Sequence, residues 1–141
     1  MRTFRRVVLV LALSCLADIF ANSGATAQTI YFGVHDIALK NGESSELAQV
    51  YYIGTNCKSL LKAPPEVEIL DGPPGVTAVI NDAKVVPRGL GCASPVPGGK
   101  LVISAQGVED YSRTRMVLRI KLKTSLGDRQ YTHDVNISLF P

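Results

Sequence analysis

Two histidines, each followed directly by an aspartate, are the residues of this sequence most like acid–base machinery: His35-Asp36 and His133-Asp134. Both pairs lie in stretches that alternate apolar and polar residues, a pattern that predicts strands. Because neighbours on a strand point to opposite faces, neither aspartate can orient the histidine beside it for proton transfer. We therefore interpret His133 as a partly buried histidine at the rim of an apolar sheet face.

The same residues are candidates for a metal site, which needs three or four converging ligands. His35, Asp36 and His133 would meet only if the first and last strands were neighbours, and no ligand spacing such as H-x-x-x-H supports them. A blue-copper site needs Cys, His and Met close together, whereas Cys92 is expected in a disulfide and Met116 in the core. We expect no metal and no cofactor.

The run GLGCASPVPGGK at Gly89–Lys100 looks at first like a phosphate-binding loop. Such a loop needs glycine where Ser94 stands, serine or threonine where Leu101 stands, and a helix after it, whereas a strand is predicted here. We interpret its glycines and prolines as the residues that turn the chain around Cys92. No G-x-S-x-G nucleophile motif occurs, so we expect no catalytic residue and predict that the chain is not an enzyme.

Two carboxylates, Glu66 and Glu68, share one face of a predicted strand, which would allow paired carboxylate chemistry. They alternate with Val67 and Ile69, as charges do on the solvated side of an amphipathic strand. The solvated strand edge is the role that we expect for them.

One predicted strand carries a row of outward-pointing cations around Val117. The row consists of Arg113, Arg115, Arg119, Lys121 and Lys123. It is a candidate binding face for an acidic partner such as anionic lipid headgroups, cell-surface polysaccharide or an acidic protein. Such alternation is also typical of an ordinary half-exposed strand, where charge protects the surface against strand-to-strand aggregation, and this second interpretation is favoured.

The first 27 residues have the form of a bacterial secretory signal. They combine a basic start, a short apolar run and a small-x-small cleavage site: Arg2, Arg5, Arg6, Val7–Leu13 and Ala25-Thr26-Ala27. The apolar run is too short to span a bilayer, so no stable membrane span is expected after its removal. The mature protein is predicted to be periplasmic or secreted. A retained anchor, a twin-arginine signal and a lipoprotein signal at Cys15 are the alternatives.

Removal of the signal leaves 141 − 27 = 114 residues, the size of one domain over residues 28–141. Three of fifteen basic and one of twelve acidic residues leave with it, so the domain carries 12 − 11 = +1. A near-neutral domain offers no electrostatic footprint for nucleic acid. Two cysteines remain, Cys57 and Cys92, and an even pair in an exported protein predicts a disulfide.

Period-two alternation, punctuated by Gly, Pro, Asn and Asp, predicts an all-β sandwich with a helical turn only at Lys58–Ala63. The expected strands are Ile30–Leu39, Glu46–Gly54, Glu66–Leu70, Val76–Ile80, Lys84–Pro87, Leu101–Ala105, Thr114–Thr124 and Gln130–Phe140. The apolar phase of the first strand switches at His35-Asp36, which predicts a bulge or a strand that changes sheets.

The last hairpin is the element that the sequence specifies best. Gly127-Asp128 is a two-residue turn signal, and placing it at the tip sets Met116 opposite Leu139 and Leu122 opposite His133. One face is then apolar apart from His133, and a slip of one residue would mix the faces. The polar pairs expected on the other face are Arg119 with Asn136 and Lys121 with Asp134.

The split first strand, the turn VEDYS at Val108–Ser112 and the long final hairpin together resemble a small exported immunoglobulin-like domain of bacterial envelopes. Tyr111 is similar to the tyrosine whose hydroxyl ties the corner before the penultimate strand to nearby backbone. The chain departs from that family in having no tryptophan and in the positions of its cysteines. The resemblance implies an antiparallel β-sandwich of about seven or eight strands with one disulfide, and a fold alone assigns no function.

We therefore expect an exported, non-catalytic binding or interaction domain of the bacterial cell envelope, whose partner is an unidentified protein or an anionic envelope component. A structural subunit of a surface assembly, pilus-like or adhesin-like, is the first alternative. Its last strand, ending at Phe140-Pro141, would be exchanged between subunits. The second alternative is an inhibitor of a secreted hydrolase that presents the disulfide-closed segment.

Overall fold

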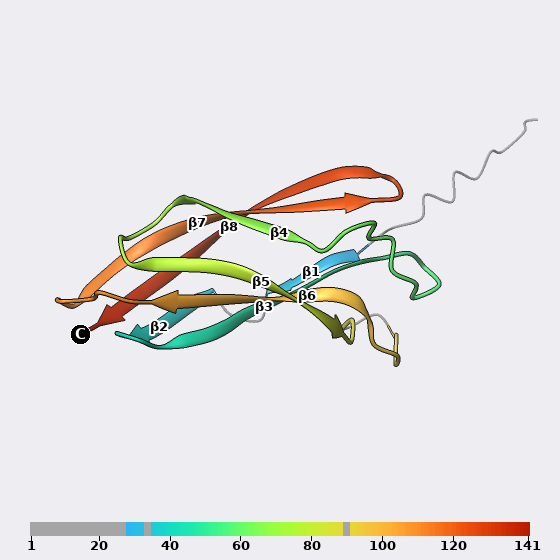
Figure 1. The fold of residues 1–141 in the computed structure, drawn as a ribbon. Coiled ribbons are helices and arrows are strands. Elements are labelled where there is room, and N and C mark those ends of the chain that lie inside the picture. The colour runs from blue at the N-terminus through green and yellow to red at the C-terminus, as the bar shows by residue number, and fades with distance from the viewer. Residues whose placement is uncertain (1–27, 33–34, 89–90) are drawn as a thin grey trace, which may run out of the picture.

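The computed structural model describes residues 28–32, 35–88 and 91–141, and the predicted signal peptide lies outside them (Figure 1). The described residues form eight strands and no helix. The strands are β1 Gln28–Phe32, β2 Asp36–Lys40, β3 Ser44–Ile53, β4 Glu66–Asp71, β5 Val76–Val85, β6 Val96–Ala105, β7 Ser112–Thr124 and β8 Gly127–Phe140. The helical turn expected within residues 58–63 is wrong, because these residues make isolated bridges to β3 and β7 instead.

The strands form two four-stranded sheets with the orders β1-β3-β6-β5 and β2-β8-β7-β4 (Figure 1). The predicted all-β sandwich is therefore confirmed. The expectation of a wholly antiparallel sandwich is wrong at one place, since β2 runs parallel to β8. The reason is that β2 reaches its sheet by a crossover from β1 and not by a hairpin, which would reverse its direction.

The first strand divides between the sheets, as its change of phase predicted. β1 pairs with β3 in one sheet and β2 pairs with β8 in the other. The crossover leaves Ile37 and Leu39 buried in the core. At its far side the His35 carbonyl accepts a hydrogen bond from the Asn136 amide at 2.9 Å, which begins the β2–β8 ladder.

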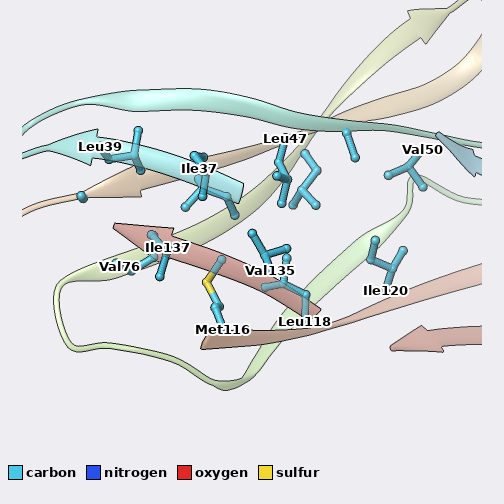
Figure 2. Close-up of a cluster of buried hydrophobic side chains, with 14 of the residues drawn as sticks. Ile37, Leu39, Leu47, Val50, Val76, Met116, Leu118, Ile120, Val135 and Ile137 are labelled. Carbon is cyan, nitrogen blue, oxygen red and sulfur yellow. The ribbon is translucent and has the colours of Figure 1, made fainter. Parts of the chain in front are cut away.

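The core lies between the sheets and is built from alternate residues of the central strands. Met116, Leu118 and Ile120 of β7 are fully buried and point toward Leu47 and Val50 of β3 (Figure 2). Each such side chain contributes roughly 1.5–3 kcal/mol by leaving water. This packing fixes the two sheets face to face, so the loops at the sandwich ends have a firm base.

The final hairpin has the predicted faces but a different register. Met116 lies opposite Val135 and not Leu139, a shift of four residues along β8. The turn falls at Ser125-Leu126, because Gly127 takes the left-handed conformation (φ 103°) just after the turn and not within its tip. A shift by an even number keeps every side chain on its face, so the buried set is as expected while the cross-strand partners are wrong.

Two further boundaries differ from expectation. β5 continues through Asn81-Asp82, which were expected to break it, because both residues pair with β6 and lie on an exposed sheet edge. β6 begins at Val96, so Gly98 and Gly99 belong to a strand and not to the predicted loop. A Cβ on Gly99 would overlap the Ile80 side chain, and one on Gly98 would overlap the backbone of β3, so both glycines permit close packing.

Candidate functional site

The structure brings the two histidines together. The rings of His35 and His133 lie 5.1 Å apart between centroids. Burial of the half-buried His133 lowers its pKa, the His35 charge lowers it further, and the charge of Asp134 opposes both effects. The predicted partly buried position of His133 is confirmed.

The two aspartates are held in ion pairs and do not face a reacting position. Asp36 lies 3.8 Å from Arg113 and accepts a hydrogen bond from the Asn136 side chain at 3.0 Å. Asp134 pairs with Arg115, so the expected pairing of Asp134 with Lys121 is wrong, as the shifted register requires. Within residues 28–32, 35–88 and 91–141 no group of three His, Cys, Asp or Glu side chains could hold a metal ion.

Of the two carboxylates Glu66 and Glu68, Glu68 is held by basic residues. The Glu68 carboxylate forms ion pairs with the Lys121 ammonium at 2.8 Å and with the Arg119 guanidinium at 3.9 Å. The hydrogen bond and charge of Lys121, and then the charge of Arg119, outweigh desolvation and lower the pKa of Glu68. Glu66, two residues before Glu68 on the same strand, is exposed. This geometry suits a charged sheet surface, because a carboxyl group with a lowered pKa is a poor proton donor.

The row of cations on β7 is interleaved with acids from the neighbouring strands. Arg113 and Arg115 pair with Asp36 and Asp134, and Arg119 and Lys121 share Glu68. Only Lys123 finds no acidic partner within 4 Å among the described residues. An anionic ligand on this face would have to displace bound carboxylates from four of the five cations. Binding at the row stays a prediction.

The disulfide between Cys57 and Cys92 is present as predicted. It joins the segment after β3 to the segment before β6, with 5.7 Å between the Cα atoms. Both cysteines pack on Tyr51, Ile53, Val85 and Val96, a second apolar cluster. Tyr51 and Ile53 alternate along β3 with core residues, so this cluster lies on the outer face of the sheet. The Gly- and Pro-rich loop thus covers an apolar patch of the outer face.

Three loops lie together at one end of the sandwich: residues 54–65 between β3 and β4, residues 86–95 between β5 and β6, and the β7–β8 tip (Figure 1). We call the described residues 54–65, 86–88, 91–95 and 121–130 the three-loop end. The amide of Lys62 donates to the Lys123 carbonyl at 2.8 Å, and the amide of Ser125 donates to the Leu60 carbonyl at 2.9 Å. Together with the disulfide, these bonds tie the three loops into one unit.

The three-loop end is strongly basic in a domain that is almost neutral. Its charged residues are Lys58, Lys62, Arg88, Lys121, Lys123, Arg129 and the single acid Asp128, a net charge of 6 − 1 = +5. Since residues 28–141 carry +1, the remainder carries 1 − 5 = −4. Lys121 is engaged by Glu68, and the side chains of Lys58, Lys62 and Lys123 are exposed.

The opposite end is acidic. Residues 41–43, 71–75 and 106–111 form the acidic end, which holds Glu43, Asp71, Glu109 and Asp110 and no cation. Backbone hydrogen bonds from Gly42 to the Ala105 carbonyl and from Gln106 to the Gly75 carbonyl join these turns. The sequence analysis missed this polarity because net charge averages over both ends. Counting charge in alternate connections would have found it, since successive connections of an up-and-down sandwich fall at opposite ends.

The surface of the three-loop end combines small hollows with an exposed apolar tip. One hollow of about 100 Å³ lies between Pro64, Glu66 and the hairpin, and another of about 230 Å³ lies between residues 61–65, Asp82 and Pro97. Small-molecule pockets typically enclose about 300–1,000 Å³, so these hollows suit a side chain better than an engulfed ligand. At the hairpin tip, the Leu126 side chain is 52% exposed.

Comparison with known proteins yields no relative: no protein-family model matches the chain, and no curated protein matches it. Among the described residues there is no helix long and apolar enough to cross a membrane. The functional inference therefore depends on the geometry and charge of the chain itself.

Proposed function

We propose that this chain is an exported, non-catalytic binding domain that engages an anionic partner through the three-loop end. The observation that carries the proposal is a net charge of +5 on two loops and the adjoining ends of β7 and β8, which a disulfide and backbone hydrogen bonds hold in place. Preorganised loops lose little conformational entropy on binding, and clustered charge steers an oppositely charged partner toward them. The disulfide is consistent with an oxidising compartment, and we propose a periplasmic or secreted location.

We also propose that the sandwich is an immunoglobulin-like domain. Its orders β1-β3-β6-β5 and β2-β8-β7-β4 correspond to the ABED and GFC sheets of that family with a divided first strand, which supports the proposal. The β3–β4 and β7–β8 connections would then be the B–C and F–G loops, which carry recognition in variable domains. Two departures are that the disulfide joins loops of one sheet and that Tyr111 is exposed against Phe140, with no hydroxyl hydrogen bond among the described residues.

The proposal is tested by retention of the exported protein on immobilised heparin, used as a generic polyanion, over a salt gradient. We expect Lys58→Glu combined with Lys62→Glu to abolish retention, because both side chains are exposed at the three-loop end. The control for position is Lys40→Glu, an exposed lysine of β2 beside the acidic end, which should leave retention nearly unchanged where Lys58→Glu alone, with the same change of charge, weakens it.

A second pair of substitutions separates the three-loop end from the β7 row. Arg113→Gln combined with Arg119→Gln should retain heparin binding, since these arginines are already paired with Asp36 and Glu68. Loss of retention in this pair together with its survival in the lysine pair would move the binding face to the row and overturn the proposal.

The polarity of the domain also favours the structural-subunit alternative as a second candidate. A basic end and an acidic end on one molecule are complementary, so copies could associate head to tail and form an open filament. Strand exchange is a less suitable route, because β8 is a central strand and its removal would break ladders to both β2 and β7. Size-exclusion chromatography at rising protein concentration and low salt tests this candidate, and a strict monomer contradicts it.

A further inference from the structure

We infer that the anionic partner of the three-loop end is a lipid surface, and that the β7–β8 tip inserts Leu126 into its headgroup region. This inference rests on the function proposed above and adds the chemistry of the partner. It is drawn from the closure of the hairpin tip, the distribution of charge along the domain and the place where the chain enters the sandwich.

Several polar groups of the tip's backbone are satisfied by its own side chains. The Thr124 hydroxyl donates to the Gly127 carbonyl at 2.7 Å and accepts from the Leu126 amide at 3.1 Å. The Arg129 guanidinium donates to the Leu126 carbonyl at 3.0 Å and to the Asp128 carbonyl at 3.1 Å. A turn closed in this way loses fewer hydrogen bonds when it leaves water, which favours its entry into a bilayer interface.

The tip therefore presents a leucine that the fold itself does not cover. Lys123 stands three residues before it, and the Lys62 amide donates to the Lys123 carbonyl, while the exposed Asp128 stands two residues after it. An apolar side chain near several cations is a combination that interfacial proteins use on anionic membranes, where the apolar group inserts and the cations contact headgroups. A stable protein interface instead relies on large aromatic anchors, and among the described residues of this end no aromatic side chain is exposed.

The charge distribution would orient the domain on such a surface. The acidic end lies at the far end of the sandwich and is repelled by anionic lipid, while the three-loop end is attracted. A single small anion would interact only with the nearest cations. An extended anionic surface attracts the whole three-loop end and repels the acidic end. This favours a lipid surface over a compact anionic ligand.

The chain also enters the sandwich at this end. Gln28, the first residue of β1, pairs with Ile53, the last residue of β3, and residue 54 begins the three-loop end. The polypeptide that precedes Gln28 contains the apolar run Val7–Leu13. The first described residue of the chain therefore lies at the three-loop end.

The experiment is flotation of the exported protein with vesicles of equal parts phosphatidylglycerol and phosphatidylcholine, beside vesicles of phosphatidylcholine alone. We expect binding to the anionic vesicles only, and weaker binding at high salt. Leu126→Ser should weaken binding roughly tenfold, the amount expected when an inserted leucine is lost. The matched control is Leu70→Ser, a 40% exposed leucine of β4 toward the acidic end, which should bind as the parent protein does.

A fluorescence measurement reports insertion directly. The chain contains no tryptophan, so Leu126→Trp supplies a single reporter at the tip. Its emission should shift to the blue on anionic vesicles, whereas that of Leu70→Trp should not. Because both positions are exposed, neither substitution disturbs the core, and unchanged thermal unfolding of each variant checks this.

The outcomes separate this inference from the function on which it rests. Unchanged vesicle binding by Leu126→Ser, or an unshifted Leu126→Trp emission, overturns the insertion of Leu126. If the protein ignores the vesicles yet is held on heparin through Lys58 and Lys62, the lipid inference fails and the anionic partner is a soluble polyanion or an acidic protein. If neither binding to vesicles nor retention on heparin depends on these lysines, the proposed function fails as well.

Discussion

Removal of the disulfide should cost the domain a large share of its stability. Oxidation of Cys57 and Cys92 closes a loop across a sequence separation of 35 residues. In the chain-entropy model such a loop restricts the unfolded state by about 4 kcal/mol. For a domain of this size, that loss corresponds to a fall in midpoint temperature of roughly 15 °C.

The strained backbone conformation of Cys57 offsets part of the stabilisation that the disulfide provides. Its φ of 60° is the only positive value for a non-glycine residue in the described part of the chain. A residue with a side chain in this left-handed region costs about 1–2 kcal/mol. The disulfide and the hydrogen bond from the Cys57 amide to the Gly54 carbonyl hold Cys57 in this conformation. With the bridge removed, glycine at position 57 should relieve that strain.

The assay is urea unfolding followed by circular dichroism on three proteins: the parent, Cys57→Ala with Cys92→Ala, and Cys57→Gly with Cys92→Ala. We expect the alanine pair to lose about 4 kcal/mol of unfolding free energy, and the glycine pair to recover about 1 kcal/mol of it. Equal unfolding free energies for the parent and the alanine pair would refute the reasoning. Equal values for the two double variants would refute only the strain at Cys57.

The remaining predictions concern the histidine pair and the core. The pKa of His133 is lowered in the folded state, so the unfolded chain takes up the proton first, and stability should be complete above the ordinary histidine pKa of about 6.5 and fall below it. His133→Gln should flatten that fall when unfolding is measured across this pH range, and an unchanged profile would contradict the assignment. Leu118→Ala should destabilise the domain by about 2–5 kcal/mol because Leu118 is fully buried, whereas Val79→Ala on the exposed sheet edge should cost little. Similar losses for both would show that the core is placed wrongly.

The final hairpin shows which part of a fold sequence patterns can specify. The alternation along β7 and β8 placed Leu118 and Ile137 in the core correctly, because a face depends only on whether a position is odd or even. The cross-strand partners depend on the turn, and Gly127 was assigned to the tip when it stands just after it. The error in register therefore moved the expected ion pairs, including that of Asp134, without moving a buried residue.

The candidate site was harder to predict than the core for a related reason. The Cys57–Cys92 bridge could be predicted because only two cysteines follow residue 27. The basic row on β7 was visible in the sequence, but its acidic neighbours belong to β2, β4 and β8, so its neutralisation depends on sheet order. The three-loop end is a still longer-range property, since its lysines come from segments that only the topology brings together.

The interior of β5 and β6 illustrates how context overrides a local signal. Asn81-Asp82 and Gly98-Gly99 are ordinary breaker residues, yet all four lie in a regular ladder between β5 and β6, in which Asp82 pairs with Gly99. Asn and Asp are tolerated because their strand lies at a sheet edge, and the glycines are required by close packing against Ile80 and β3. Neither condition can be seen in a local window of sequence.

The most direct test of the central claim is an NMR titration of the ¹⁵N-labelled protein, residues 28–141, with a heparin oligosaccharide, in which every backbone amide reports its own surroundings. We predict that the chemical shifts change within residues 54–65, 86–88, 91–95 and 121–130, at the three-loop end, while the amide signals of the acidic end do not shift. Changes confined to residues 113–119 of the β7 row, or spread evenly over both ends, would contradict the account.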